Sequence, residues 1–310
     1  MVGYQREGRN LEMRVCYEGQ DQLLMASPAK LNFYLELHHR RDDGFHELET
    51  IMTKFGLFDY LYFKKQPVDA FSLEVRSNSR LSDQAIPTDE SNLIIKSLSV
   101  MRDLAGCKLG AAIRLFKNIP AQAGMGGASS NAAAAIYAAN RLWNLRWSQQ
   151  RLMQIAAEIG SDVAFFLGAN LAKCIGRGEK VQKLSGRCRF NIVVAQPPTG
   201  ISTAELYARC HVPEAPQNSQ GLTSGLAEGD ALMVGRNLFN RLEGVAEHVN
   251  GDVLKLRSEF ARTHCLGHQL TGSGSCYFGL YRHQRNMRTA AQVLANRLPE
   301  MNIMTGQSLT

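Results

Sequence analysis

Hydrophobic residues recur along the chain with two periods, and each period predicts a different kind of element. Between residues 31 and 37 every second residue is Leu or Phe, the alternation expected of a β-strand. A turn at residues 41–44 precedes a second predicted strand at 51–63, and a short strand is expected at 71–75 within a polar stretch. This part of the chain therefore predicts a sheet.

The next part of the chain has helical spacing. Apolar residues three and four apart between positions 94 and 104 predict a helix that Asp89 or Ser91 caps and that Gly106 ends. The elements predicted after it are a strand at 111–115 and helices at 131–143, 148–159 and 163–167.

The second half of the chain mixes both kinds of element. Strands are predicted around residues 176–178, at 191–195 and within 269–280, and a last strand follows a helix at 284–298. Residues 213–230 are rich in Pro, Gly and Ser, which predicts a surface loop. Strands first and a mixed pattern later predict a two-domain α+β protein, with a flexible N-terminal extension at 1–24 and domains at 25–185 and 186–310.

Composition places the chain among ordinary globular proteins. It has 310 residues, of which 45% are hydrophobic and 20% charged, enough apolar residues for a buried core. No apolar run approaches the roughly 20 residues of a membrane helix, and the N-terminal residues lack the apolar stretch of a secretory signal. The cysteines, 7 in number and never spaced C-x-x-C, suit reduced thiols. We therefore expect a cytoplasmic protein with no membrane partner.

The net charge of +7 is spread along the chain and forms no block. A solvated surface explains it most simply, and an anionic small molecule is the partner that it favours next. A nucleic-acid partner is not expected, because no stretch combines basic with aromatic residues. The sequence leaves the oligomeric state open between a monomer and a homodimer.

The small-residue loop before the Ala-rich helix is the most informative stretch for chemistry. Small side chains let backbone N–H groups approach an anion, and the positive end of the helix dipole points to the same place. Ser129 and Ser130 can cap that helix or donate hydroxyls to a phosphate. The loop predicts a phosphate site, with tight helix packing as the alternative, and its candidate residues are Pro120, Ala121, Gln122, Ala123, Gly124, Met125, Gly126, Gly127, Ala128, Ser129 and Ser130.

Two better-known phosphate loops do not fit this stretch. A Walker loop needs a Gly-Lys pair, and none occurs in the chain. A dinucleotide fingerprint that began at Gly124 would need a glycine at position 129, which is Ser. A second small-residue run contains Gly272, Ser273 and Gly274. Alone it is typical of a hairpin turn, and together with the first loop it would give one polyanion two backbone-lined walls.

Lys30, Asn32 and Asp162 are candidates for phosphoryl-transfer chemistry, which needs neutralised charge, an aligned nucleophile and often a base. Lys30 and Asn32 share one face of the first predicted strand. Asp162 precedes a predicted helix, and capping is the more frequent role of Asp at such a position. For Lys30 the alternative is a solvated lysine at a strand end. Spacing alone does not bring these side chains together.

Two other constellations would carry different chemistry. Ser27 and Lys30 have the spacing of S-x-x-K acyl-transfer enzymes, but that motif opens a helix, and its partner motifs Lys-Thr-Gly and Ser-Asp-Asn are absent. His264, Cys265 and His268 are residue types that bind metals, but no further ligand group has suitable spacing, so ordinary polar side chains are expected. A non-catalytic nucleotide-binding module would keep the glycine loop and lose the lysine or the carboxylate, and both are present.

In their order along the chain, these motifs resemble the GHMP superfamily of small-molecule kinases. The resemblance covers roughly residues 25–300, and its motifs lie at 27–32, 43–50, 120–131, 161–163 and 270–274. The first two, Ser-Pro-Ala-Lys-Leu-Asn and Asp-Gly-Phe-His-Glu-Leu-Glu-Thr, point to the branch that phosphorylates a cytidyl diphosphate methylerythritol. Activity like that of mevalonate or homoserine kinase is the alternative.

The resemblance implies a first domain like domain 2 of ribosomal protein S5, a ferredoxin-like second domain, and a cleft between them for ATP and substrate. It implies transfer of the γ-phosphate of ATP, with Mg²⁺, to the 2-hydroxyl of the methylerythritol. Asp162 would be the base, kept basic by burial, and Lys30 would hold the base and the attacking oxygen by its charge. No Mg²⁺ ligand is assigned.

The same mapping places the remaining site residues. Asn32 would orient the substrate, the Phe45 ring would stack on cytosine, and His46 would hydrogen-bond to it. The other implied residues are Thr203 and Tyr207 at the cytidine side, Gly272, Ser273 and Gly274 over the methylerythritol diphosphate, and Asn92 and Lys117 near adenine.

Three departures from the family pattern stand out. Phe45 replaces a common Tyr and loses a hydroxyl contact, and Ala164 replaces a frequent Pro. Met125 and Ala128 stand where Leu and Gly are usual, which puts a methyl group near the phosphates. None removes a reacting group, so we expect an effect on affinity more than on activity.

Overall fold

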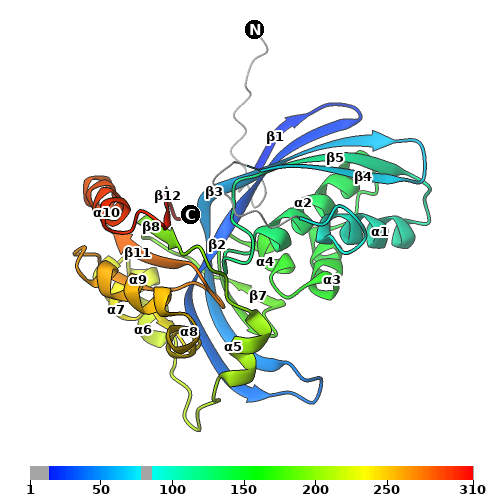
Figure 1. Ribbon diagram of the computed structural model, residues 1–310. Helices are drawn as coiled ribbons and strands as arrows, with labels where there is room; N and C mark the ends of the chain where they lie inside the picture. Colours follow the sequence, from blue (N-terminus) through cyan, green and yellow to red (C-terminus); the bar gives the residue numbers. More distant parts are fainter. Residues whose placement is uncertain (1–13, 78–85, 310) are drawn as a thin grey trace.

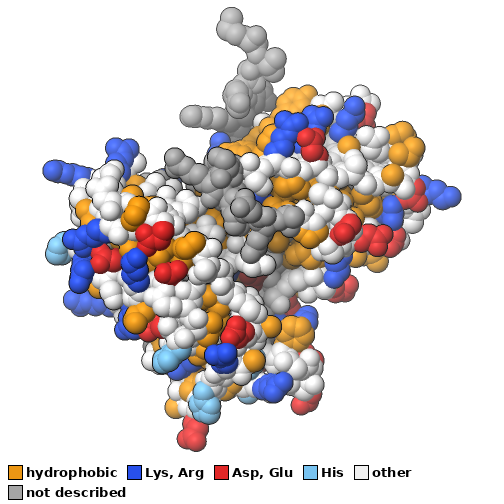
Figure 2. Space-filling model, viewed as in Figure 1, with side chains coloured by type: hydrophobic (Ala, Val, Ile, Leu, Met, Phe, Trp, Pro, Cys, Tyr) orange, Lys and Arg blue, Asp and Glu red, His pale blue; other side chains and the backbone are white. Residues whose placement is uncertain are grey.

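The computed structural model describes residues 14–77 and 86–309. Within these residues, two β-sheets, one of eight strands and one of four, lie side by side, and helices pack on each (Figure 1). Basic and acidic side chains are interspersed over the face seen in Figure 2, as expected for a solvated surface. The predicted domain boundary near residue 185 falls between the last hairpin of the first sheet and the first strand of the second, and it stays a proposal.

The larger sheet is built on one long hairpin. Its strands are β1 (Arg14–Glu18), β2 (Gln22–Arg40), β3 (His46–Gln66), β4 (Phe71–Ser77), β5 (Gly110–Lys117), β6 (Leu171–Gly176), β7 (Lys180–Lys183) and β9 (Phe239–Asn240). The order is β1-β2-β3-β5-β4, β6 pairs with β3 and β7, and β9 pairs with β2. The β2–β3 hairpin is antiparallel, whereas β9, from the second half of the chain, adds to β2 in parallel.

Four helices cover one face of this sheet (Figure 1): α1 (Leu93–Ala105), α2 (Gly127–Leu142), α3 (Gln149–Ile159) and α4 (Val163–Gly168). The alanines at 132–135 of α2 are all fully buried. Their small side chains let the helix lie close to the sheet, and this fixes the start of α2 against β2.

The smaller sheet has the order β10-β11-β8-β12. Its strands are β8 (Asn191–Gln196), β10 (Gly267–Leu270), β11 (Tyr277–Tyr281) and β12 (Asn302–Gln307). The helices of this half are α5 (Thr203–Arg209), α6 (Gln220–Glu228), α7 (Ala231–Arg236), α8 (Glu243–Val249), α9 (Gly251–Ala261) and α10 (Gln284–Arg297). None of the helices in the described part of the chain has the length and apolar character needed to cross a membrane.

Strand β2 passes from one hydrophobic core to another. Its first residues pack with α1–α4, and after a register shift that follows Pro28, Leu31 and Phe33 face the smaller sheet. There the Phe33 ring stacks on Phe278 with centroids 5.9 Å apart. Lys30 and the residues next to it therefore lie where the two cores meet.

Three sequence predictions are wrong at this level. The flexible extension does not reach residue 24, because 14–18 form β1 and its Val15 packs on the core; residues 1–13 lie outside the described residues. The predicted loop at 213–230 contains α6, whose Leu222 and Leu226 lie one turn apart and are buried. Asn92, not Asp89 or Ser91, caps α1, since its side chain accepts a 2.9 Å hydrogen bond from the Ile94 amide.

Candidate active site

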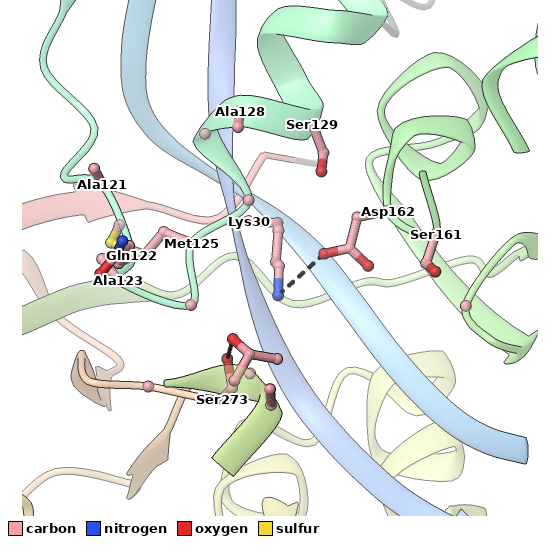
Figure 3. Close-up of a pocket in the computed structure, with 18 of the residues that line it drawn as sticks. Lys30, Ala121, Gln122, Ala123, Met125, Ala128, Ser129, Ser161, Asp162 and Ser273 are labelled. Atoms are coloured by element: carbon pink, nitrogen blue, oxygen red, sulfur yellow. Dashed lines mark hydrogen bonds and ion pairs between the residues drawn. The ribbon is translucent and has the colours of Figure 1, made fainter. Parts of the chain in front are cut away.

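Lys30 and Asp162 meet where β2 crosses between the two cores (Figure 3). Lys30 Nζ lies 3.5 Å from a carboxylate oxygen of Asp162 and donates a 2.5 Å hydrogen bond to Asn32 Oδ1. Lys30 belongs to β2, and Asp162 directly precedes α4, so distant segments supply the pair. A cation beside a carboxylate is an arrangement that can deprotonate a hydroxyl and stabilise the resulting charge.

Asp162 does not cap α4. It occupies the N-cap position, but its side chain accepts no capping hydrogen bond, and its carboxylate is turned toward Lys30 (Figure 3). The capping role favoured by position alone is therefore wrong. The expected burial is also only partial, because 30% of the Asp162 side chain is exposed, compared with 5% for Lys30. The carboxylate is thus accessible from the cavity, while the lysine is fixed in the wall.

Asn32 is held in one orientation by neighbouring strands. Its Nδ2 donates to Thr50 Oγ1 at 2.8 Å, and the Thr50 hydroxyl donates to the carbonyl of Tyr34 at 2.6 Å. The Asn32 N–H donates to Thr271 Oγ1 at 3.2 Å. The side-chain bond to Thr50 orients the amide so that Asn32 Oδ1 faces Lys30, and the backbone bond to Thr271 ties β2 to the loop after β10. Both threonines stand inside motifs, Thr50 at the end of 43–50 and Thr271 within 270–274, but sequence analysis assigned no role to either.

The glycine-rich loop is pressed against the strand that carries Lys30. Gly124 and Gly126 have φ of +69° and +67°, a conformation that favours glycine. A Cβ atom on Gly126 would lie 2.9 Å from Lys30 Cγ, and one on Gly124 would lie 2.0 Å from the carbonyl oxygen of Thr271. The Lys30 N–H also donates to the carbonyl of Met125 at 2.9 Å. Glycine is needed here by both conformation and space.

The two serines of this loop lie in different environments, and neither has the predicted capping role. Helix α2 begins at Gly127, with Gly126 as N-cap, so neither serine is the cap. Ser129 lies in the first turn and lines the cavity. Ser130 does not: it is fully buried and accepts a 2.6 Å hydrogen bond from Ser27 Oγ. Because the helix starts earlier than predicted, Ser130 faces the sheet, and its predicted place in the phosphate site is wrong.

The second small-residue run forms the opposite wall. Thr271 Oγ1 donates to the carbonyl of Gly124 at 3.3 Å, which ties the two loops together. A Cβ atom on Gly272 would lie 3.1 Å from Lys30 Nζ. The hydroxyls of Ser273 and Thr203 are 2.7 Å apart, which links this loop to the start of α5.

One cavity of about 1630 Å³ joins these features. A site for one drug-sized ligand usually has about 300–1,000 Å³, so this cavity has room for two nucleotide-sized ligands. It is lined by all the residues that the sequence assigned to the site except Ser130: Lys30, Asn32, Phe45, His46, Asn92, Lys117, residues 120–129, Asp162, Thr203, Tyr207, Gly272, Ser273 and Gly274.

Aromatic side chains gather around the β2–β3 turn. The rings of His46 and Tyr207 have centroids 5.6 Å apart, and 51% of Phe45 is exposed. The Arg177 guanidinium lies 5.0 Å from the centroid of the Phe45 ring. Burial, with Arg40 nearby, lowers the pKa of His46. Sequence analysis missed Arg177, which follows β6, because the pattern at 176–178 predicts only strands there.

The other part of the cavity is lined by Asn92 and Lys117. Asn92 caps α1, as described above. Lys117 is almost fully buried, and its Nζ lies 2.7 Å from a carboxylate oxygen of Asp59. Burial lowers the pKa of Lys117, and Asp59 opposes this effect. Sequence analysis also missed Asp59, which lies inside β3.

The structure does not place the S-x-x-K motif or the His264, Cys265 and His268 group in the environment that acyl transfer or metal binding would need. The S-x-x-K motif lies within β2 and opens no helix, and its serine, Ser27, is fully buried and does not line the cavity. Just before the motif at 270–274, His268 Nδ1 lies 3.0 Å from the Tyr277 hydroxyl, and Cys265 Sγ donates to the carbonyl of Phe260. Across residues 14–77 and 86–309, no group of three or more His, Cys, Asp or Glu side chains is arranged to hold a metal ion.

Comparisons with known proteins agree with this geometry. Residues 92–169 match the family model of the GHMP kinases N terminal domain, and residues 222–300 match that of the GHMP kinases C terminal. Fold and site thus define an ATP-dependent small-molecule kinase of the GHMP class.

Relatives and solved structures narrow the family. A 4-diphosphocytidyl-2-C-methyl-D-erythritol kinase of Caldicellulosiruptor bescii is 33% identical, covering 89% of this chain and 96% of that protein. One of Rhodopirellula baltica is 36% identical, with 88% and 91% covered. A crystal structure of 4-(cytidine 5'-diphospho)-2C-methyl-D-erythritol kinase has a TM-score of 0.75 at 29% identity, covering 93% of this chain and 99% of that one. The chain belongs to the 4-diphosphocytidyl-2-C-methyl-D-erythritol kinase family.

More distant structures share the fold. A homoserine kinase from Cytophaga hutchinsonii has a TM-score of 0.73 at 18% identity, with 95% of this chain and 96% of that chain covered. The two-domain α+β architecture predicted from the sequence is confirmed by these comparisons.

Proposed function

We propose that the protein transfers the γ-phosphate of ATP to the 2-hydroxyl of 4-diphosphocytidyl-2-C-methyl-D-erythritol, giving the 2-phosphate and ADP in the non-mevalonate isoprenoid pathway. The observation that carries this proposal is the Lys30–Asp162 pair, 3.5 Å apart, between two small-residue loops of one cavity. The relatives that carry the name of this reaction support the choice of acceptor.

In the proposed reaction, Asp162 accepts the proton of the 2-hydroxyl group, and the oxygen of that hydroxyl forms a bond to the γ-phosphorus. The bond from that phosphorus to the bridging oxygen breaks, and ADP leaves. A tertiary alcohol is a poor nucleophile, and the charge of Lys30 stabilises the negative charge that develops on its oxygen. Asn32, whose side-chain amide is held by Thr50, orients the acceptor.

The triphosphate is proposed to lie along residues 120–129, which line the cavity up to the first turn of α2, because a helix start favours an anion. Asn92 and Lys117 would lie toward adenine. Mg²⁺ bound through ATP phosphates takes only one or two protein oxygens and neutralises phosphate charge. The Ser129 hydroxyl and the Asp162 carboxylate point toward the same space (Figure 3), so oxygen donors suited to it are present.

The cytidine end is proposed to bind between Phe45 and Tyr207. The lowered pKa of His46 keeps its ring neutral near pH 7, so that one nitrogen can accept and the other can donate a hydrogen bond. Thr203 and the 272–274 loop would contact the diphosphate and the methylerythritol. We place the reaction in the cytoplasm, because all 7 cysteines are free thiols.

The test is a coupled ADP-release assay on the full chain. The acceptors are the cytidylated substrate, mevalonate, homoserine and galactose, each at the same concentration, with Asp162→Asn as the matched control. ADP release that depends on the cytidylated substrate and is lost in the variant supports the proposal. Faster turnover of any other acceptor would assign the protein to another activity of the same class.

A further inference from the structure

A fully buried carboxylate lies beneath the glycine-rich loop, and the proposed reaction does not use it. Asp59, on β3, has no exposed surface. Its Oδ2 accepts hydrogen bonds from Lys117 Nζ at 2.7 Å and from Asn131 Nδ2 at 2.8 Å. Its Oδ1 accepts the N–H groups of Asn118 and Ile119, both at 2.8 Å. One carboxylate thus joins β3, the end of β5 and α2.

These are the segments that enter and leave the glycine-rich loop. Lys117 is the last residue of β5, and its Nζ also donates to the carbonyl of Ile119, just before the loop. A Cβ atom on Gly127 would lie 3.0 Å from Lys117 Nζ, so this ammonium group rests against the first residue of α2. The start of a helix carries partial positive charge. A buried cation is unfavourable there unless an anion lies beside it.

We infer that Asp59 is a positioning residue for ATP, which keeps the Lys117 ammonium charged and directed at the cavity and holds both ends of the glycine-rich loop. The inference rests on the proposed ATP site. Asp59 is absent from the cavity lining, whereas Lys117 and Asn131 belong to it. Asp59 therefore acts through these two side chains and does not touch the nucleotide.

The charge balance around Lys117 gives the inference a distinctive consequence. Among the described residues, Asp59 is the charged group that contacts Lys117, and the other contacts, from Ile119 and Gly127, are neutral. Burial lowers the pKa of Lys117, and Asp59 raises it. Without the carboxylate, Lys117 should lose its proton at lower pH. Its contribution to ATP binding should then fall as the pH rises.

The experiment compares Asp59→Asn with the wild-type chain. Asn keeps one oxygen for the Asn118 and Ile119 amides, removes the charge, and puts an NH2 group in place of the oxygen that accepts from Lys117 and Asn131. The Kd of ATP is measured by calorimetry from pH 6 to pH 9 and given as the ratio of variant to wild type, so that titration of ATP itself cancels. We expect ATP to bind about ten- to a hundred-fold more weakly at pH 9, the range for one charged hydrogen bond. The ratio should shrink toward pH 6, and the Kd of the cytidylated substrate should stay unchanged.

A matched control is Glu36→Gln. Glu36 is also fully buried on the same β2–β3 hairpin, but its ion pair is with Arg241. This variant should be less stable than the wild type, but the ratio of its Kd for ATP to that of the wild type should be the same at every pH. If Asp59→Asn does not fold, Asp59→Asn/Lys117→Met buries no unpaired charge and is expected to fold. It should bind ATP more weakly than the wild type, by a factor that does not depend on pH.

The inference is overturned if the Kd ratio for ATP in Asp59→Asn is independent of pH and equal to the ratio in the control variant. A double variant that binds ATP as tightly as the wild type also overturns it. Failure of the wild-type chain to bind ATP contradicts the proposed function itself, and this result is distinct because it needs no variant.

Discussion

Replacing Gly124 with alanine tests whether the two small-residue loops must touch for the site to work. The added Cβ would lie 2.0 Å from the carbonyl oxygen of Thr271, whereas real Cβ contacts are essentially never shorter than 3.0 Å. The loops must therefore move apart by about 1 Å, a displacement that can reduce a reaction rate by about 100-fold. The φ of +69° adds a conformational cost of about 1–2 kcal/mol for alanine.

Gly106→Ala separates these two costs. Gly106 has a similar φ of +61°, but no atom lies within 4 Å of its Cβ position. Both variants should thus lose about 1–2 kcal/mol of unfolding free energy from conformation, measured by urea denaturation. Only Gly124→Ala should also lose turnover, by about 100-fold in the ADP-release assay. Equal turnover in the two variants would refute the view that contact between the loops sets the geometry of the site.

The other predictions concern single side chains. Asp162→Asn should bind ATP normally in calorimetry while kcat falls by about 100- to 10,000-fold, and unchanged turnover would rule out the base. Lys30→Ala should lower kcat in a similar way, and a change confined to the KM of ATP would contradict its role. Phe45→Ala should weaken binding of the cytidylated substrate by about two- to ten-fold through lost stacking and leave ATP binding unaffected. Equal weakening of both ligands would contradict the placement of the cytidine pocket at Phe45. Burial alone would raise the pKa of Glu36, but hydrogen bonds from Arg241 and two amides lower it overall. The ionised Glu36 should therefore stabilise the fold fully at pH 7, and this stabilisation should be lost as the pH falls through the lowered pKa. Between pH 7 and pH 3, Glu36→Gln should thus lose less unfolding free energy than the wild type, as measured by urea denaturation.

Periodicity located most of the elements because burial repeats locally. The alternation at 31–37 marks β2, and Gly106 ends α1 where predicted. It failed at α6, where Gly and Ser between Leu222 and Leu226 concealed a helical face that packing makes stable. It also failed for Ser130, because a glycine, Gly126, serves as the helix N-cap and α2 starts four residues early.

The site was only partly predictable for a related reason. Short motifs named Lys30 and Asp162, but their separation depends on a register shift after Pro28 and on the path of the chain into α4. Neither is encoded in a local pattern. Asp59 and Arg177 lie within or beside strands with no motif of their own, and the motif that contains Thr50 does not show its role, so only the folded structure reveals what each contributes to the site.

The parallel pairing of β9 with β2 means that the two halves of the chain are not interchangeable modules. Cutting the chain near residue 185 would strip β2 of that neighbour and leave the apolar side chains of Leu31 and Phe33 facing water. Neither fragment would contain a complete catalytic centre. The site lies at the interface between the two halves of the chain. Replacing one half with that of another protein should therefore abolish activity if it alters this interface, even when each half still folds.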